Sequence, residues 1–408
     1  MVEKLLKNQP TEYSVLYLDM DSFFASVEQQ FDARLRSQPV VVCPCASDST
    51  SVVAASIEAK RRGIRTGMKV YRARLLCPEL IVVSTKPALY RQIHYGLMEV
   101  LNNTLGLAVS KGIDEAYVLI PSYLRDFGAV LDMAAAIKSA ITSKLGSHIG
   151  CSIGIAPNIW LAKMAASFNK PNGLFILELD QLAWFYSRLN LLDFTGINWR
   201  LARRFYNLGI YSPSQLYVAS HAFMKHYFGV NGQKWYLRLR GYEVDNRLKL
   251  PARSIGHQVT LPPVSRRDPA VIRATLIKIC CHIGYRMRHS GLKSRLMLVG
   301  LFYADRTYLT RTVYLERPTW TDSDLASPQL LETVTRLTKG KIVRKLSITM
   351  LHLAIDRQMV LFGQDELKKN NLSAAIDRIN GSYGPDTIGP AAVLGRSAMH
   401  DQIGFGNF

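Results

Sequence analysis

The chain has 408 residues, of which 48% are hydrophobic and 10% aromatic. This length is too great for a single hydrophobic core, so we expect two to four domains, and the apolar content excludes a disordered protein. The 51 lysines and arginines exceed the 31 acidic residues, which gives a net charge of +20. Such an excess favours a polyanionic partner, most simply a nucleic acid. No run of apolar residues is long enough to predict a membrane span.

The first half of the chain alternates short strands with helices. Strands are predicted at residues 13–22, 40–42, 51–55, 107–110, 117–120 and 149–155. Helices are predicted from residue 23 onward, at 89–104, at 127–144, and through 161–163 to about residue 169. This alternation is typical of an α+β sheet that is covered by helices.

Two carboxylate clusters follow apolar, strand-like runs. Asp19 follows Val15–Leu18, and the pair Asp114 and Glu115 follows Leu107–Val109. Two strand ends lying side by side would bring these carboxylates together, where they repel one another and require cations. Oxygen ligands of this kind suit Mg²⁺ or Mn²⁺, and two such ions roughly 3.5–4 Å apart promote in-line displacement at phosphorus. The alternative is structural, because aspartate is also common at strand ends and helix N-caps.

The following region, residues 178–245, is predicted to be helical. Phe194–Asn198, followed by Leu208–Ile210, resembles a helix–hairpin–helix, whose glycine-led turn points N–H groups toward a DNA phosphate. Asn198 stands where this motif usually has a second glycine, and Phe228–Gly232 is a weaker match to a second hairpin. A tight turn between helices, with no ligand, explains either segment equally well. A polar stretch that contains Pro251 then predicts a linker.

The last third of the chain has a different order of elements. A strand at 253–261 is followed by a helix at 269–289, strands at 295–303 and 307–315, a helix at 325–338 and a strand at 344–355. This order, β-α-β-β-α-β, is a split βαβ unit, and its basic surface is expected to follow nucleic-acid phosphates. Another helix is predicted at 365–380.

The cysteines and the N-terminal residues indicate the compartment. The six cysteines show neither metal-ligand nor disulfide spacing, and Cys43-Pro44-Cys45 has no partner pair. Residues 1–13 are polar and contain no apolar signal core. Reduced thiols and the absence of such a core predict a cytoplasmic protein.

The two carboxylate clusters carry a resemblance to a known family. The strings D-M-D-S-F-F-A-S-V-E at 19–28 and I-D-E-A-Y at 113–117 resemble the palm signature of the Y-family DNA polymerases, the translesion enzymes. The resemblance extends along most of the chain and implies an α+β multidomain, right-hand polymerase. It implies a palm at 1–22 and 86–177, small fingers at 23–85, a helical thumb at 178–245, a linker at 246–253, a β-α-β-β-α-β little finger at 254–356, and a tail at 357–408.

The resemblance also implies the metal ligands. Asp19 and Asp114 would bridge two Mg²⁺ ions, or Mn²⁺ in their place, and Glu115 would complete the site of the catalytic ion. The main-chain carbonyl of Met20 would supply one further oxygen. Asp21 is not carried over as a ligand, and we interpret it as a helix N-cap because the chain turns there.

Four further residues match nucleotide-binding positions of the family. Phe24 matches the steric gate that excludes a 2′-hydroxyl, and Phe23 the adjacent aromatic of the nucleotide pocket, although core packing would also explain both rings. Lys170, within N-K-P-N-G, and Lys60 match positions that bind the incoming triphosphate.

The chain departs from the family pattern near these positions. Many members carry an aromatic hydroxyl and an arginine where this chain has Ile57 and Lys60, and a serine where it has Gly112. Lysine also lacks the bidentate fork of arginine. These fingers residues resemble the UmuC branch, whereas Ser254–His257 and the little finger resemble the DinB, or DNA polymerase IV, branch. The departures concern nucleotide affinity rather than the metal site.

A short peptide after the last predicted strand suggests a protein partner. Gln358, Leu361 and Phe362 resemble the peptide by which bacterial polymerases dock on the sliding clamp, although a strand end followed by a helix would also explain them. The implied partners are therefore primer–template DNA, a dNTP and the clamp, for a monomeric protein with no membrane contact.

The predicted function is DNA-directed synthesis by two-metal nucleotidyl transfer to a primer 3′ hydroxyl, with low fidelity and no proofreading. One alternative is a non-catalytic, Y-family-like scaffold that binds DNA, but such proteins typically lose the metal carboxylates that this chain retains. Another is a nucleotide cyclase with a palm domain, which would have no use for a basic little finger. Lesion preference, the level of fidelity, the branch and any dedicated partners are not readable from the sequence.

Overall fold

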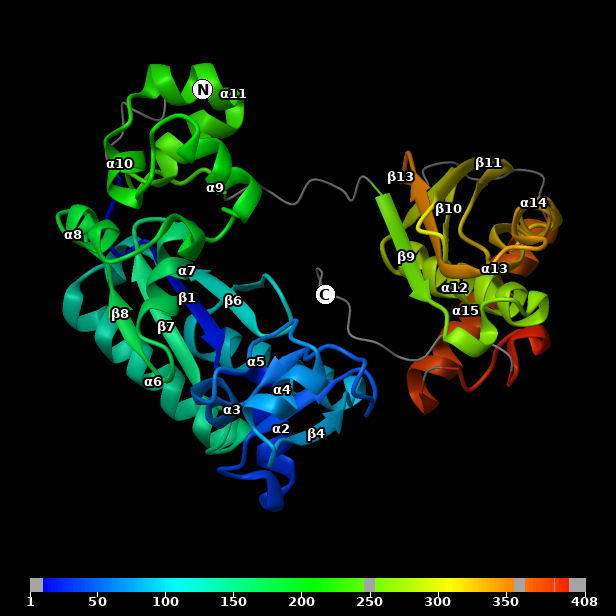
Figure 1. Cartoon of the computed structure of the whole chain (residues 1–408), viewed down its shortest axis with the longest axis horizontal. Coiled ribbons are helices and arrows are strands. Elements are labelled where there is room, and N and C mark those ends of the chain that lie inside the picture. The colour runs from blue at the N-terminus through cyan, green and yellow to red at the C-terminus, as the bar shows by residue number, and fades with distance from the viewer. Residues whose placement is uncertain (1–9, 246–253, 356–363, 385, 396–408) are drawn as a thin grey trace. The chain divides into compact units, whose positions relative to one another are not determined.

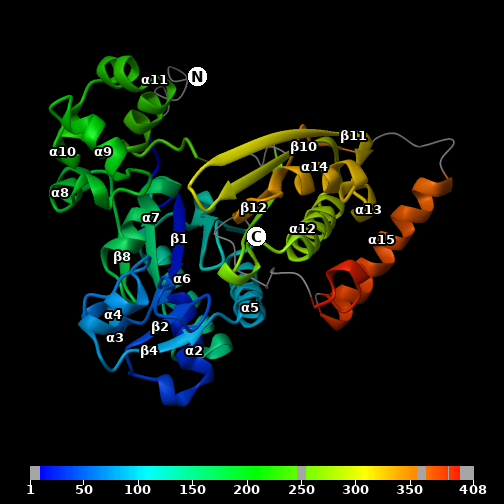
Figure 2. The ribbon, with the colours of Figure 1, turned by 45° about the vertical axis from the view of Figure 1, so that its right-hand side comes forward.

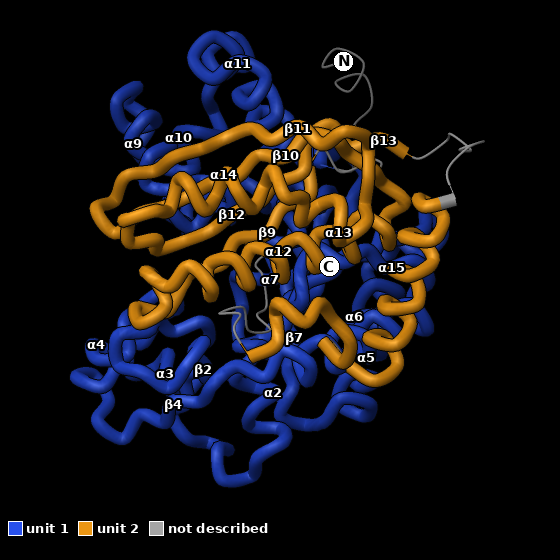
Figure 3. Tube along the Cα trace, turned by 90° about the vertical axis from the view of Figure 1, so that its right-hand side faces the viewer, with its two compact units in different colours: residues 1–248, 402–408 blue, residues 249–401 orange. Residues whose placement is uncertain are grey.

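The computed structural model describes residues 10–245, 254–355, 364–384 and 386–395. The chain divides into two compact units, of which unit 1 contains the described residues up to Asp245 and unit 2 those from Ser254 onward (Figures 1 and 3). The predicted linker at 246–253 lies outside the described residues, as does the peptide with Gln358, Leu361 and Phe362. Among the helices that are described, none is both long and apolar enough to cross a membrane.

A five-stranded sheet, in the order β5-β6-β1-β7-β8, forms the centre of unit 1. Its central strand, β1, pairs antiparallel with both β6 and β7, and β7 pairs parallel with β8. The strands are β1 (Val15–Met20), β5 (Ala108–Ser110), β6 (Glu115–Leu119), β7 (Cys151–Ala156) and β8 (Leu174–Ile176). The sheet and its register decide where the candidate carboxylates lie, because the end of β1 lies beside the start of β6.

Helices cover both faces of this sheet, so β1 is buried on each side. Leu16 and Leu18 pack into one core together with the helices α2 (Phe23–Phe31), α5 (Pro87–Leu105) and α6 (Phe127–Leu145). Val15 and Tyr17 point to the opposite core, which contains α7 (Ile159–Phe168). The alternation follows from the two-residue repeat of a strand. The four predicted helices of this region are therefore present, with ends displaced by a few residues.

A smaller three-stranded sheet, in the order β3-β2-β4, has its own core. It contains β2 (Val40–Cys43), β3 (Ala54–Ala55), β4 (Ile81–Ser84), α3 (Ile57–Arg61) and α4 (Val70–Leu76). The predicted strand at 51–55 was too long. Ser51 makes only an isolated bridge with Lys69, and the N–H of Val52 donates to the carbonyl of Met68, so this part of the run joins a loop rather than the sheet.

The remainder of unit 1 is helical, as predicted. It comprises α8 (Leu182–Ser187), α9 (Trp199–Tyr206), α10 (Pro213–Val218) and α11 (His221–Arg238). Their core is aromatic, and the ring of Trp160 from α7 packs edge-on against both Phe194 and Trp235. Gly229 has a φ of 57° inside α11, so the segment with the weaker hairpin pattern is a kinked helix.

Unit 2 is a four-stranded antiparallel sheet, in the order β11-β10-β12-β9, with helices on one face (Figure 2). It contains β9 (Ser254–Thr260), α12 (Pro269–His289), β10 (Leu292–Tyr303), β11 (Tyr308–Thr319), α13 (Asp322–Leu325), α14 (Pro328–Thr338) and β12 (Val343–Leu351). The element order β-α-β-β-α-β is confirmed. The strands β9 and β10, which α12 connects, lie on either side of β12, as in a split βαβ unit.

Two predicted elements of unit 2 have different bounds. The helix predicted at 325–338 is α14, which begins at Pro328 because Ser327 caps it by accepting a hydrogen bond from the N–H of Leu330, whereas Leu325 is the last residue of the short α13. The strand predicted at 344–355 breaks at His352, whose φ is 51°, and resumes as β13 (Ala354–Ile355).

A last helix, α15 (Gln364–Tyr383), follows in unit 2 and includes the predicted range 365–380. Short 3₁₀ turns complete the described structure, at Ala33–Leu35, Ser122–Leu124, Leu191–Asp193, Pro263–Ser265 and Ala391–Val393.

Candidate active site

Pairing of β1 with β6 places the predicted carboxylates together. Asp19 lies directly opposite Glu115 in the register of these strands. The N–H of Met20 donates a hydrogen bond of 2.8 Å to the carbonyl of Asp114, which fixes the loop before β6 against the end of β1. Two segments about ninety-five residues apart in the sequence therefore bring Asp19, Asp114 and Glu115 to one corner of the sheet.

The electrostatics of this corner are those of crowded like charges. Burial and the negative charges of Asp19 and Glu115 raise the pKa of Asp114 to about 6. Burial also raises the pKa of Asp19, with a further contribution from Glu115, although Lys170 acts in the opposite direction. Simultaneous ionisation of the three groups is therefore costly unless positive charge is close by.

Two lysines supply part of that positive charge. Lys170 forms an ion pair with Asp19, and Lys163 on α7 forms one with Glu115. Sequence reasoning placed Lys170 near the triphosphate and missed Lys163. The missed signal was a single lysine within the otherwise apolar run of α7, where a charge without a partner would be costly.

The carboxylates fit a divalent-cation site by their chemistry and by their shared position. Hard, anionic oxygen donors are what Mg²⁺ and Mn²⁺ prefer, and burial together with the charges of Asp19 and Glu115 makes the ionised form of Asp114 unfavourable without a further cation. With Asp19 and Glu115 each turned to a lysine, no three His, Cys, Asp or Glu side chains within the described ranges gather closely enough to enclose a metal ion. Bound cations would therefore take over contacts that the two lysines make in this structure.

Asp21 does not cap a helix, so that interpretation was wrong. The N-cap position of α2 is Ser22, which makes no capping hydrogen bond with its side chain. The buried carboxylate of Asp21 instead accepts hydrogen bonds from the Ser152 hydroxyl, at 2.9 Å, and from the N–H of Asn172, at 2.6 Å. Asp21 thus holds the loop that carries Lys170 against the sheet.

A third lysine, Lys60 on α3, lies within electrostatic reach of Asp19, Asp21 and Lys170. Burial lowers its pKa and the charge of Lys170 lowers it further, whereas Asp21 and Asp19 act to raise it. Lys60 and Lys170 are therefore close enough to influence each other, although they are far apart in the sequence. Ile57 begins α3, whose N-cap Ser56 accepts a hydrogen bond from the N–H of Ala59.

The two phenylalanines at the start of α2 are both buried. Their ring centroids lie 5.5 Å apart, and the ring of Phe24 lies 4.6 Å from that of Tyr90 on α5. The structure thus places Phe24 against a second aromatic residue that sequence reasoning did not single out.

A buried histidine supports the loop that carries Asp114. The Nδ1 atom of His94 lies 2.9 Å from the carbonyl oxygen of Ile113, and burial lowers the pKa of this histidine. At Gly112 a Cβ atom would lie 3.2 Å from Cγ of Glu115, so the glycine leaves room for that side chain.

The hairpin before α9 has the predicted glycine-led turn. Gly196 has a φ of 98°, a conformation that glycine adopts readily. Asn198, which differs from the usual glycine of the motif, caps α9 by accepting a hydrogen bond of 3.0 Å from the N–H of Leu201. Its side chain therefore has a local structural role.

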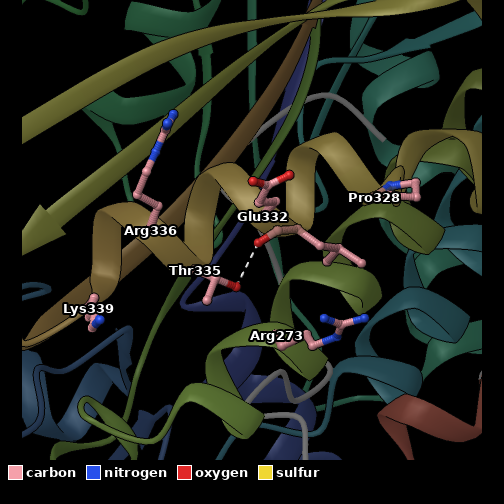
Figure 4. Close-up of a pocket in the computed structure, with 7 residues that line it drawn as sticks. Arg273, Pro328, Glu332, Thr335, Arg336 and Lys339 are labelled. Carbon is pink, nitrogen blue, oxygen red and sulfur yellow. Dashed lines mark hydrogen bonds between the residues drawn. The ribbon is translucent and has the colours of Figure 1, made fainter.

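A groove of about 610 Å³ lies elsewhere, between α12 and α14 of unit 2 (Figure 4). Three basic side chains, Arg273, Arg336 and Lys339, line it together with Glu332. None of the predicted site residues contributes to this groove, so its position does not bear on the carboxylate cluster.

Comparison with known proteins identifies the family. Residues 18–167 match the impB/mucB/samB family, and residues 252–361 match the C-terminal domain of that family. DNA polymerase IV of Pelotomaculum thermopropionicum is 31% identical over 406 residues, covering 95% of this chain and 99% of the relative. DNA polymerase IV of Desulfatibacillum aliphaticivorans is 30% identical over 401 residues, covering 96% and 99%.

This chain belongs to the DinB-like Y-family DNA polymerases. It is a DNA-directed DNA polymerase of the translesion type. Solved structures agree with this assignment. A Y-family chimera of Dbh and Dpo4 aligns with a TM-score of 0.70 at 26% identity, covering 84% of this chain and 99% of the chimera. An insertion ternary complex of Dbh DNA polymerase aligns with a TM-score of 0.57, at the same identity and coverage.

Proposed function

We propose that unit 1 is the catalytic part of the polymerase and that unit 2 is its little finger. The central sheet and its helices would form the palm, at 1–22 and 86–177, and the small sheet the fingers, at 23–85. The helices at 178–245 would form the thumb, followed by a linker at 246–253, the little finger at 254–356 and a tail at 357–408. Unit 2 and the small sheet each have a core of their own, which supports the division there, whereas the helices at 178–245 share a core with one face of the central sheet.

The reaction would be nucleotidyl transfer from a dNTP to a primer 3′ hydroxyl, at a site for two divalent ions. Asp19 and Asp114 would hold both ions, with Glu115 and the carbonyl of Met20 supplying further oxygens. Mg²⁺, or Mn²⁺, supplies a lowered pKa for the attacking hydroxyl and stabilises the leaving oxygen. The observation that carries the proposal is the meeting of three carboxylates at the ends of β1 and β6, with the pKa of Asp114 raised to about 6.

The lysines around this corner would bind the triphosphate. Lys60 and Lys170 lie close to each other and to Asp19, so both can reach an anion bound beside the carboxylates. Lys170 would exchange Asp19 for a phosphate oxygen when nucleotide and cations bind. Asp21 would keep the Lys170 loop in place during this exchange, because its hydrogen bonds are made to Ser152 and to the backbone of Asn172.

Phe24 would act as the steric gate against ribonucleotides, and Phe23 would line the same pocket. Both rings lie in the first turn of α2, just after the strand that carries Asp19. A ring fixed beneath the sugar leaves no room for a 2′-hydroxyl. Ribonucleotides are therefore excluded by shape and not by a specific hydrogen bond.

The chain would act as a monomer on primer–template DNA in the cytoplasm. Its charge of +20 favours a polyanion, and solved complexes of Dbh are described as ternary complexes. A small fingers sheet would constrain the nascent base pair weakly, which predicts low fidelity, and we assign no proofreading site to the chain. Retention of all three carboxylates argues against a non-catalytic scaffold.

Primer extension tests the proposal directly. The purified protein should extend a primer on undamaged template with four dNTPs and Mg²⁺, and EDTA should abolish extension without releasing the DNA. Mn²⁺ should restore activity. DNA binding without extension under either metal would contradict the catalytic proposal and favour a scaffold.

Gln358, Leu361 and Phe362 would bind a sliding clamp. Such a short peptide binds weakly alone, so its effect should arise from the raised local concentration when clamp and polymerase share one DNA. Replacement of all three residues by alanine should spare extension without clamp and remove stimulation by a loaded clamp. Equal stimulation of both proteins would show that the match is accidental.

A further inference from the structure

The proposed steric gate rests on a second aromatic residue that is itself held in place. Tyr90 is fully buried, and its ring lies 4.6 Å from that of Phe24 with an angle of 31° between the ring planes. Phe23 contributes a looser contact, because its centroid lies 6.5 Å from that of Tyr90. The position of the Phe24 ring therefore depends on where Tyr90 is fixed.

A buried carboxylate fixes Tyr90. The Tyr90 hydroxyl donates a hydrogen bond of 2.7 Å to one oxygen of Glu28, and Nζ of Lys86 lies 2.5 Å from the other oxygen. The side chain of Glu28 is 0% exposed, whereas that of Lys86 is 55% exposed. A buried carboxylate requires such partners, so all three side chains are held in one arrangement.

The spacing of these residues makes the arrangement a link between two helices. Glu28 follows Phe24 by four residues on α2, and Tyr90 follows Lys86 by four residues at the start of α5. Residues four apart lie on the same side of a helix. Phe24 and Glu28 thus share one side of α2, while Tyr90 on α5 and Lys86, the N-cap residue before that helix, both contact Glu28.

The hydrogen bond from Tyr90 persists over the working pH range. Burial and the hydrogen bond to Glu28 both raise the pKa of Tyr90 far above its ordinary value. The hydroxyl therefore remains a donor, and a hydrogen bond to a charged acceptor is among the stronger ones that a side chain can make.

We propose that Tyr90 and Glu28 are positioning residues for sugar selection, which set the location of the Phe24 ring beneath the nucleotide. This inference rests on the proposed function of Phe24. Without the hydroxyl–carboxylate contact, the Tyr90 ring can shift and Phe24 can yield to a 2′-hydroxyl. Discrimination against ribonucleotides then falls, while insertion of deoxyribonucleotides changes little.

The test compares insertion of dCTP and rCTP opposite template G by full-length variants. Tyr90→Phe retains the ring and removes the hydroxyl, so the ratio of kcat/KM for dCTP over rCTP should fall on the order of tenfold. Glu28→Gln should lower the ratio in the same direction. The kcat for dCTP should remain within about threefold of wild type.

Tyr186→Phe is the matched control. Tyr186 is also fully buried, and its hydroxyl donates a hydrogen bond of 2.7 Å to the carbonyl of Leu239, far along the chain from the gate. This variant loses a comparable buried hydrogen bond and should keep the wild-type ratio. If it lowered the ratio as much as Tyr90→Phe, general loosening of the core would explain both results and the proposal would be overturned.

Phe24→Ala distinguishes failure of the steric gate from failure of the positioning role of Tyr90. An unchanged ratio in this variant would remove the steric gate itself. A lowered ratio in Phe24→Ala with an unchanged ratio in Tyr90→Phe would overturn the positioning role alone. Because Tyr90 acts through Phe24, adding Tyr90→Phe to Phe24→Ala should lower the ratio no further.

Lys86→Met keeps the proposal testable if Tyr90→Phe does not fold. The side chain of Lys86 is half exposed, so its replacement creates less strain, yet it removes the cation that balances Glu28. The ratio should fall by about threefold, in the same direction as in Tyr90→Phe. A wild-type ratio in Lys86→Met and in Glu28→Gln would overturn the proposal.

Discussion

Carboxylates of the two units have opposite surroundings. In unit 1, Asp19, Asp114 and Glu115 lie beside one another at two strand ends, and the pKa of Asp114 is raised to about 6. In unit 2, Arg288 contacts both Asp322, at 2.8 Å, and Asp377, at 2.6 Å. The first arrangement concentrates three carboxylates whose negative charge Lys163 and Lys170 balance only in part, whereas in the second one arginine is paired with both carboxylates.

The balanced arrangement holds α15 to the rest of unit 2. Glu366 is paired with Lys293, Lys369 with Asp324, and Asn370 accepts a hydrogen bond of 2.7 Å from the Trp320 indole. The described residues of α15 contribute nothing to the buried apolar core of unit 2. The ion pairs of unit 2 therefore hold α15 in place. For the crowded carboxylates of unit 1, by contrast, we infer that they are retained for chemistry at a cost in stability.

Asp114→Asn should show the largest effect and should separate activity from stability. Primer extension should fall by at least about 100-fold, because the neutral amide is a poor ligand for divalent cations. In EDTA at pH 7.5 the free energy of unfolding should rise by about 1 kcal/mol, because one of three like charges is removed. Primer extension and urea denaturation measure the two effects.

The stability gain in this variant depends on pH. The pKa of Asp114 is raised above the unfolded value of about 3.9, so its charged form opposes folding above pH 6. The stability gain should be complete above pH 6 and absent below about pH 4. Burial raises the pKa of Asp322 as well, although Arg288 acts in the opposite direction. Asp322→Asn is the matched variant in unit 2. It breaks the ion pair of 2.8 Å with Arg288, so it should lower stability and leave extension per folded molecule at the wild-type level. Loss of stability in both variants would erase the distinction between the units.

Arg288→Met should cause the largest loss of stability. The arginine side chain is 10% exposed, and it also donates to the carbonyl of Trp320 at 2.8 Å. Its removal leaves Asp322 and Asp377 without their shared cation, at a cost on the order of 3 kcal/mol. Hydrogen–deuterium exchange should show faster exchange in α12 and α15 of the full chain. Unchanged protection in both helices would mean that apolar packing alone holds this region.

The sequence predicted that Asp19, Asp114 and Glu115 lie together, which the pairing of β1 with β6 confirms, because their types and spacing form long, specific strings. It also predicted the β-α-β-β-α-β order, since apolar periodicity governs strands and helices that share a core. It failed at Asp21 and Lys163, whose partners come from distant segments, namely Ser152, Asn172 and Glu115. Contacts of that kind leave no local pattern in the sequence.

The early start predicted for α14 had a different cause. Ser327 and Pro328 carry a local capping signal, yet Leu325 continues the apolar repeat of the helix and concealed it. The docking of α15 could not be predicted by apolar periodicity either. The residues of α15 that contact the rest of unit 2, among them Glu366, Asn370 and Asp377, are polar. Their partners are cations and a tryptophan N–H of other elements.

His257 of unit 2 lies near other positively charged groups. Burial, together with the neighbouring His282 and Arg286, lowers its pKa to about 4. Because the folded pKa lies below the unfolded value of about 6.5, stability should be full above pH 6.5. It should fall by about 1 kcal/mol per pH unit as the pH decreases toward 4.

Thermal unfolding of wild type and His257→Asn at several pH values measures this effect. The variant should lack the loss below pH 6.5 that the wild type shows, since asparagine does not titrate. An equal loss of thermal stability in both proteins would show that other groups cause the acid sensitivity. His257 would then be no exception to the balanced charges of unit 2.

Arg317→Gln should have the smallest effect on stability, because both carboxylates that Arg317 contacts have a second cation. The arginine side chain is 45% exposed and lies 3.2 Å from Glu366 and 3.7 Å from Asp324. Each carboxylate keeps another cation, Lys293 at 3.1 Å or Lys369 at 2.6 Å. Partly exposed pairs contribute little, so urea denaturation should show a loss in the free energy of unfolding below about 0.5 kcal/mol, which shrinks further in 0.5 M salt.

Lys293→Met is the contrasting variant, because the lysine side chain is 8% exposed and its replacement should cost several times more stability. Equal losses in the two variants would show that burial does not decide the strength of these pairs.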